Sequence, residues 1–173
     1  MTGRRGSVVF ATVGIVTVAL ALTACDQVEF EERITSPMDH DEAKGEVESL
    51  YNEVIEVVGE GWNAPEAAWR DCRAVGEEEA WAQMSQRFGD LDATPDVLAS
   101  KVAEAWRGLG YDVAVVSDST ITPPRKVVSY PAYLTGTTDD GFGAVFSVGE
   151  GYADFRGYGR CVPIDADRDD FSS

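Results

Sequence analysis

Two stretches of the chain repeat apolar residues at the three-and-four spacing that is typical of a helix with one buried face. In the first, the apolar positions are Val47, Leu50, Tyr51, Val54, Ile55 and Val58, with acidic residues between them. Gly59 follows the last of them and is expected to end the helix, and Ser36-Pro37 is a candidate start. This pattern predicts an amphipathic helix that packs on a core.

The second helix has clearer boundaries. Thr94-Pro95-Asp96 combines an N-cap residue, a proline suited to the first turn and an acid that favours the positive end of the helix dipole. The expected buried face consists of Leu98, Val102, Ala105, Trp106 and Leu109. Gly108 or Gly110 is expected to stop the helix.

Most of the remaining chain alternates apolar and polar residues, as half-buried strands do. The predicted strands cover residues 68–76, 111–116, 126–134, 142–148 and 152–162. Phe142, Ala144, Phe146 and Val148 should share one face. Pro131 cannot donate to a strand ladder, so it is expected to place its strand at an edge or a bulge.

Residues 77–90 are ambiguous because Trp81, Met84 and Phe88 have helical spacing, whereas their position suits the return strand of a hairpin. We favour the strand slightly, in part because of the resemblance described below. Strands that follow one another along the chain indicate an antiparallel arrangement. The predicted fold class is therefore α+β, an antiparallel sheet with two main helices on one face.

The N-terminus has the layout of a secretory signal peptide. Arg4 and Arg5 precede an apolar run from Val8 to Leu22, which is short for a membrane span. The next residues complete Leu22-Thr23-Ala24-Cys25, which resembles a bacterial lipobox. That resemblance implies cleavage after Ala24 and attachment of lipid to Cys25, which would hold the protein on the extracytoplasmic face of the cell membrane. The alternative is an ordinary secreted protein with a cysteine there by chance.

These features divide the chain into four parts. Residues 1–24 form the expected lipoprotein signal peptide, and residues 25–40 form a charged, flexible tether. Residues 41–164 form a single α+β domain, and residues 165–173 form an acidic tail. The tail alternates carboxylates like a calcium loop, but Asp170 stands where that loop needs glycine, so we interpret it as a solvated tail.

Cys72 and Cys161 are the cysteines left after Cys25. Outside the cytoplasm conditions are oxidising, so these two residues are expected to form a disulfide. A zinc site would need more ligands, and the chain has a single histidine, His40.

The chain carries a formal net charge of −17. Nucleic acid is therefore not expected as a partner, because phosphates would be repelled and no basic stripe is present. The partners we expect are the membrane, through the lipid on Cys25, and an envelope protein or a cell-wall component.

The order of these features is similar to small actinobacterial lipoproteins of the LppA-like kind. The resemblance rests on the lipobox, the early cysteine, Gly110-Tyr111-Asp112-Val113 and the closing Cys161-Val162-Pro163. It implies the fold and the disulfide, and it carries no activity over to any residue of this chain.

No catalytic residue, cofactor or metal ligand is predicted. His40 lies in the expected tether, where it would be exposed and no rigid scaffold would hold it as a base. Trp62, Trp69, Tyr130 and Tyr133 are candidate ligand contacts, although aromatic residues more often belong to the core. The sequence thus favours a non-catalytic binding module in the cell envelope, and the alternative is a small envelope hydrolase that uses acidic residues.

Overall fold

The computed structural model describes residues 38–72 and 77–164, which belong to one unit of the chain, Thr35–Ser173. The expected signal peptide, Cys25, the tether up to residue 37 and the acidic tail all lie outside the described residues. In chain order the elements are α1 (His40–Val58), β1 (Glu66–Asp71), β2 (Glu78–Phe88), α2 (Pro95–Gly108), β3 (Ala114–Asp118), β4 (Arg125–Tyr130), β5 (Gly143–Gly149), β6 (Tyr152–Tyr158) and β7 (Val162–Pro163).

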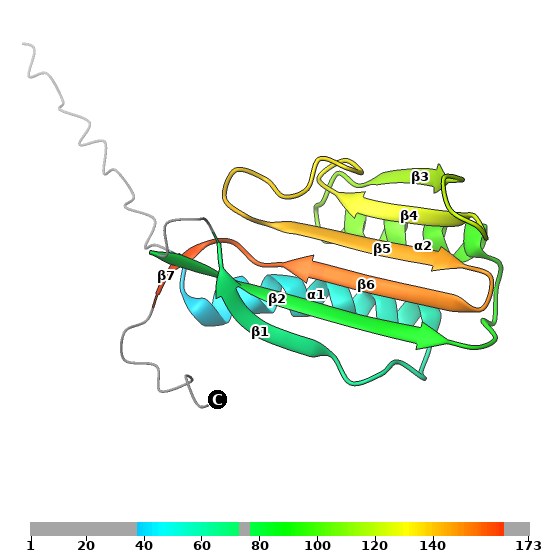
Figure 1. Ribbon diagram of the computed structural model, residues 1–173, viewed down its shortest axis with the longest axis horizontal. Coiled ribbons are helices and arrows are strands. Elements are labelled where there is room, and N and C mark those ends of the chain that lie inside the picture. The colour runs from blue at the N-terminus through cyan, green and yellow to red at the C-terminus, as the bar shows by residue number, and fades with distance from the viewer. Residues whose placement is uncertain (1–37, 73–76, 165–173) are drawn as a thin grey trace, which may run out of the picture. The chain divides into compact units, whose positions relative to one another are not determined.

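The seven strands form one sheet in the order β1-β2-β6-β5-β4-β3, with β7 paired to β2, and every pair is antiparallel. Both helices lie on the same face of this sheet (Figure 1). Helix α1 packs on β2 and β6, and helix α2 packs on β4 and β5. The predicted α+β class is confirmed.

The core lies between the helices and the sheet. Its largest fully buried side chains are Trp106, Phe142, Phe146, Phe155, Leu50, Val47 and Val54. The Trp106 indole donates to the Leu50 carbonyl at 3.1 Å, which joins α2 to α1 and satisfies a buried polar atom. The face predicted for 142–148 is confirmed, since Phe142, Phe146 and Val148 have no exposed surface.

Helix α1 starts later than its expected Ser36-Pro37 cap. The Asp39 carboxylate accepts a hydrogen bond from the Glu42 amide at 2.8 Å and caps the helix. His40 is thus the first helical residue and not part of a tether, and its Nε2 lies 2.9 Å from Oε1 of Glu79. The expectation of an exposed histidine was wrong, because the cap turns the chain onto the sheet there. The predicted end at Gly59 is confirmed.

Helix α2 has the predicted start, with Thr94 as N-cap and Pro95 in the first turn. Its buried face includes the predicted Leu98, Val102 and Trp106. Leu109 was expected to be buried but is 44% exposed, because the helix ends at Gly108 and the chain turns away through Gly110.

The ambiguous residues 77–90 form a strand, β2, as we favoured. Its odd-numbered side chains face the helices, which is why Ser85 accepts from the Tyr51 hydroxyl of α1 at 2.8 Å. Met84 and Phe88 point to the other face and are 40% and 73% exposed. Their helical spacing with Trp81 is therefore coincidental.

Several strand boundaries differ from the sequence prediction. Strand β1 is Glu66–Asp71 where 68–76 was predicted, and β3 is Ala114–Asp118 where 111–116 was predicted, because residues 110–113 form the turn that leaves α2. Strand β4 ends at Tyr130 and lies between β3 and β5, so the edge position expected from Pro131 was wrong. Pro131 comes just after the strand, where its missing amide removes nothing from the ladder. The predicted strand 152–162 is two elements, since β6 ends at Tyr158 and β7 begins at Val162.

The predicted disulfide between Cys72 and Cys161 is confirmed. It joins the residue after β1 to the residue before β7, with 5.7 Å between the Cα atoms. Gly141 lies against both sulfur atoms, and a Cβ there would come within 2.4 Å of the Cys161 sulfur. The bridge therefore also fixes the loop that leads into β5.

Candidate functional site

The four aromatic residues predicted as ligand contacts lie in separate places. Trp62 follows α1, donates to the Gly59 carbonyl at 3.0 Å and packs edge-on against Tyr51. Trp69 in β1 contacts the His40 ring at a centroid distance of 4.7 Å. Both indoles lie on the helix side of the sheet and fill space beside the core.

Tyr133 lies over the helix-free side of the sheet, where it joins a polar cluster at the end of β3. Its hydroxyl donates to Oδ2 of Asp118 at 2.7 Å, and Nε of Arg125 donates to the same oxygen at 3.1 Å. Asp118 is only 6% exposed. Hydrogen bonds from Thr120, Tyr133 and Arg125 hold the pKa of its carboxyl well below the ordinary value. The ionised carboxylate of Asp118 thus holds the loops around it through hydrogen bonds to Thr120, Arg125 and Tyr133.

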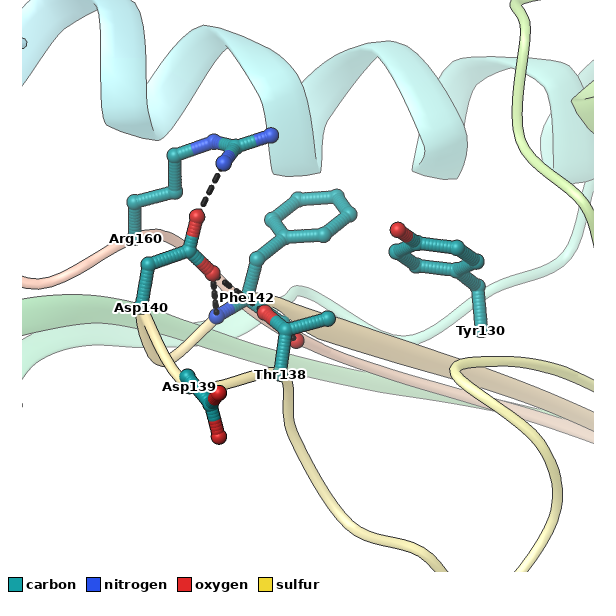
Figure 2. Close-up of a pocket in the computed structure, with 6 residues that line it drawn as sticks. All are labelled: Tyr130, Thr138, Asp139, Asp140, Phe142 and Arg160. Carbon is teal, nitrogen blue, oxygen red and sulfur yellow. Dashed lines mark hydrogen bonds and ion pairs between the residues drawn. The ribbon is translucent and has the colours of Figure 1, made fainter.

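Tyr130 lines a shallow pocket of about 320 Å³ near the disulfide (Figure 2). The other residues that line it are Thr138, Asp139, Asp140, Phe142 and Arg160. The guanidinium of Arg160 pairs with Asp140, and its Nε donates to Glu46 of α1 at 2.9 Å. Burial alone would raise the pKa of Asp140, but the Thr138 hydroxyl and Arg160 lower it. Arg160 is thus bonded to Asp140 in the loop and to Glu46 in α1, so it joins this loop to the helix.

A second hollow crosses the face of the sheet that no described helix covers. Two adjoining pockets of about 220 and 300 Å³ share Gln86, Asp154 and Arg156. We call this hollow the sheet-face trough. Its further lining residues are Asn63, Glu66, Met84 and Ser85 at one end and Phe88, Arg125, Tyr152 and Ala153 at the other.

The register of β2 and β6 builds this trough. Met84 is opposite Arg156, Gln86 is opposite Asp154, and Phe88 is opposite Tyr152. Directly opposed residues of an antiparallel pair project from the same face, so these three pairs stand side by side. The residues between them, such as Phe155, point into the core.

A buried carboxylate organises the middle of the trough. Asp154 is 7% exposed; its Oδ2 accepts from Nε2 of Gln86 at 3.2 Å, and its Oδ1 lies 3.2 Å from Nε of Arg156. Gln86 and Arg156 are thereby oriented while they remain exposed to solvent. Asp154 is thus the partner that holds both side chains in place.

An aromatic pair forms the far end of the trough. The Tyr152 ring lies across Gly149, where a Cβ would come within 2.3 Å of a ring carbon. Only glycine leaves room for the ring to rest there. Phe88 stands beside it and is 73% exposed. Large exposed aromatic groups next to a hollow are typical of binding surfaces.

Comparison of this chain with protein-family models, with curated proteins and with solved structures gave no match. The site must therefore be interpreted from its own chemistry. No helix in the described part of the chain is long and apolar enough to cross a membrane. Within residues 38–72 and 77–164, no three His, Cys, Asp or Glu side chains gather where they could hold a metal ion.

Sequence reasoning missed the trough. Its signal was the alternation of Met84, Gln86 and Phe88 with the opposed set Tyr152, Asp154 and Arg156. Each set becomes visible once both segments are assigned as strands. Their pairing across β2 and β6 joins residues about seventy positions apart, and the sequence alone does not specify that pairing.

Proposed function

We propose that this protein is a lipid-anchored lipoprotein of the extracytoplasmic membrane face, which binds a component of the cell envelope without chemical turnover. The sheet-face trough is the binding surface, and the lipid on Cys25 is the anchor. The observation that carries this proposal is an exposed hollow of aromatic, amide and guanidinium groups on the sheet face that no described helix covers.

Two features support the extracytoplasmic location. Leu22-Thr23-Ala24-Cys25 follows an apolar run with basic residues before it, as lipoprotein signal peptides do. The disulfide between Cys72 and Cys161 is an independent indication, because such bridges persist in oxidising compartments and are rare in the cytosol.

The position of the trough suits a tethered module. Chain from the anchor enters the described domain at Met38, and His40 then contacts Glu79 near the start of β2. Phe88 is at the other end of this strand, about 30 Å away at the usual rise per residue. The aromatic end of the trough is thus remote from the point where the tether joins the domain.

The charged groups of the domain favour binding over hydrolysis. A general acid in a glycosidase needs a carboxyl group that stays protonated. The buried carboxylate Asp118 instead accepts hydrogen bonds from Thr120, Tyr133 and Arg125, which lower its pKa and stabilise the ionised form. The other buried carboxylate, Asp154, is paired with Arg156.

Site-specific photo-crosslinking in the protein's own membranes tests the proposal. A benzophenone side chain at the position of Phe88 should give a defined adduct, and Arg156→Ala should diminish it. The matched control is a benzophenone at Glu56, which is exposed on α1 in the opposite layer. Equal adducts at both positions, or none at Phe88, would refute the trough as the binding surface.

Turnover assays test the non-catalytic part. We expect no hydrolysis of peptidoglycan, glycan or ester substrates by the purified protein. Hydrolysis that a single Asp or Glu substitution abolishes, with the fold intact, would replace this proposal with the hydrolase.

A further inference from the structure

We infer that the sheet-face trough binds an uncharged carbohydrate, with a sugar ring stacked on Tyr152 and adjacent hydroxyl groups bonded by Gln86 and Arg156. This inference rests on the proposed function and names the ligand class for the same surface.

The trough lies on the face of a sheet and not at its edge. Strand β2 is paired with β6 along the whole trough, and on its other side it is paired with β1 as far as Met84. Beyond Met84 the Gln86 amide donates to Oδ1 of Asn63, and the Gln86 carbonyl accepts from the Asn63 amide, so these backbone groups are also occupied. An extended peptide that binds by strand addition needs a free edge. A ligand in the trough is therefore recognised by side chains alone.

Those side chains present donors and acceptors next to each other. Gln86 uses its amide nitrogen to bond Asp154, so its Oε1 remains an acceptor for a ligand. The two Nη nitrogens of Arg156 have no hydrogen-bond partner among the residues that the structure describes, so they are adjacent donors. A hydroxyl group both donates and accepts. Neighbouring sugar hydroxyls match this arrangement without any charge on the ligand.

The aromatic end supplies an apolar contact of suitable shape. Tyr152 is held across Gly149 and so presents a positioned ring beside Phe88. The C–H face of a sugar ring is apolar and flat enough to stack on such a surface, while its hydroxyls point outward. The pockets, about 220 and 300 Å³, lie at the small end of ligand sites, which suits a single sugar unit in each.

The charge of the trough also favours an uncharged ligand. The chain as a whole has 31 acidic and 14 basic residues. The trough, by contrast, is lined by two carboxylates, Glu66 and Asp154, and two guanidiniums, Arg125 and Arg156. A site for a cationic ligand is expected to carry more carboxylates than guanidiniums, as the whole chain does. A site for an anionic ligand is expected to contain cations that no carboxylate neutralises.

Titration of the full-length protein, followed by amide NMR in a detergent without a sugar headgroup, tests the inference. The probes are cellotetraose, mannotetraose and tetra-N-acetylchitotetraose. Tetragalacturonic acid is the charged probe of the same length, and capped tetra-alanine is the peptide probe. We expect at least one neutral oligosaccharide to shift the amide signals of Gln86, Phe88 and Tyr152, with an affinity that salt does not change.

Variants distinguish stacking from a structural effect. Tyr152→Ala should weaken binding about tenfold, and Tyr152→Phe, which keeps the ring, should bind like the parent. Gly149→Ala displaces the Tyr152 ring from its position across residue 149. It should weaken binding, while the urea midpoint of unfolding stays unchanged. Tyr158→Ala is the matched control, because Tyr158 is 42% exposed on the same strand face but lines neither pocket.

Several results would overturn the inference. These are preferential binding of the charged or peptide probe, no binding of any neutral probe, or equal losses for Tyr152→Ala and Tyr158→Ala. The crosslinking at Phe88 tests the binding surface independently of the ligand class. If it succeeds while the neutral sugars fail, the binding module stands and the carbohydrate assignment falls.

Discussion

At the scale of single residues, several buried or half-buried polar groups of this domain are satisfied in small clusters around arginines. Asp118 shows the principle, because a nearly buried carboxylate accepts bonds from Thr120, Tyr133 and Arg125. These bonds require the ionised form of Asp118. They tie the end of β3 to β4 and to the loop that carries Tyr133.

The lowered pKa of Asp118 makes this cluster sensitive to acid. A carboxyl whose folded pKa is depressed stabilises the fold fully above its unfolded value, about 3.9, and loses that contribution as the pH falls toward the folded value. We therefore expect Asp118→Asn to be less stable than the parent at pH 7, with a difference that shrinks below about pH 4. Urea unfolding at pH 7 and pH 3 measures this.

Asp112→Asn controls for the loss of one acidic charge, since Asp112 is exposed before β3. A difference between Asp118→Asn and the parent that does not change with pH would contradict the prediction.

At the scale of elements, the sheet surface has to be flat where α1 crosses it. Gly157 in β6 lies directly below the helix, and a Cβ there would come within 2.6 Å of a Val47 methyl group. Val47 has no exposed surface and belongs to the packed core. The close approach of α1 to β6 therefore depends on glycine.

Gly157→Ala is expected to lower the free energy of unfolding by about 1 to 3 kcal/mol, because overpacking forces the helix or the strand to shift. Gly149→Ala is the matched control, since the same change there meets the outer atoms of the Tyr152 side chain, which can rotate aside, and not the buried Val47. Denaturant unfolding of both variants checks this. If Gly157→Ala were as stable as Gly149→Ala, the close approach of α1 to β6 would not depend on glycine, which would contradict the prediction.

The same scale explains how much could be predicted from the sequence. Helices α1 and α2, the buried face of β5 and the disulfide follow from periodicity, capping and composition, which are local signals. The start of α1 was missed because Asp39 and the contact of His40 with Glu79 draw the chain inward. The trough was missed because it depends on the β2–β6 register, which is a long-range property.

At the scale of the whole molecule, the disulfide spans 89 residues and encloses α2 and five strands of the sheet, β2 to β6. Closing a loop of that length restricts the unfolded chain strongly. The bridge therefore stabilises the domain as a unit and not one hairpin.

Cys72→Ser is expected to lower the free energy of unfolding by about 2 to 5 kcal/mol, and Cys161→Ser should lower it equally. Urea unfolding measures the change, and reduction of the parent protein should reproduce it. A parent protein whose stability does not respond to reductant would contradict this.

Anchoring through Cys25 is tested on the intact protein. We expect the mass of the membrane-bound protein to fit an acylated chain that begins at Cys25. We expect Cys25→Ala to be released from the membrane or left uncleaved. An unmodified Cys25 in the membrane fraction would refute the anchor.

The bridge between Cys72 and Cys161 also determines how the protein responds to mechanical force. When the two ends of the chain are pulled apart, tension passes from Cys72 to Cys161 through the sulfur atoms and bypasses the 89-residue loop. Only the segments outside the loop can lengthen, which include α1 and β1 on one side and β7 on the other. Strands β2 and β6, which carry the trough, lie inside the loop, so stretching the chain by its ends cannot draw them out.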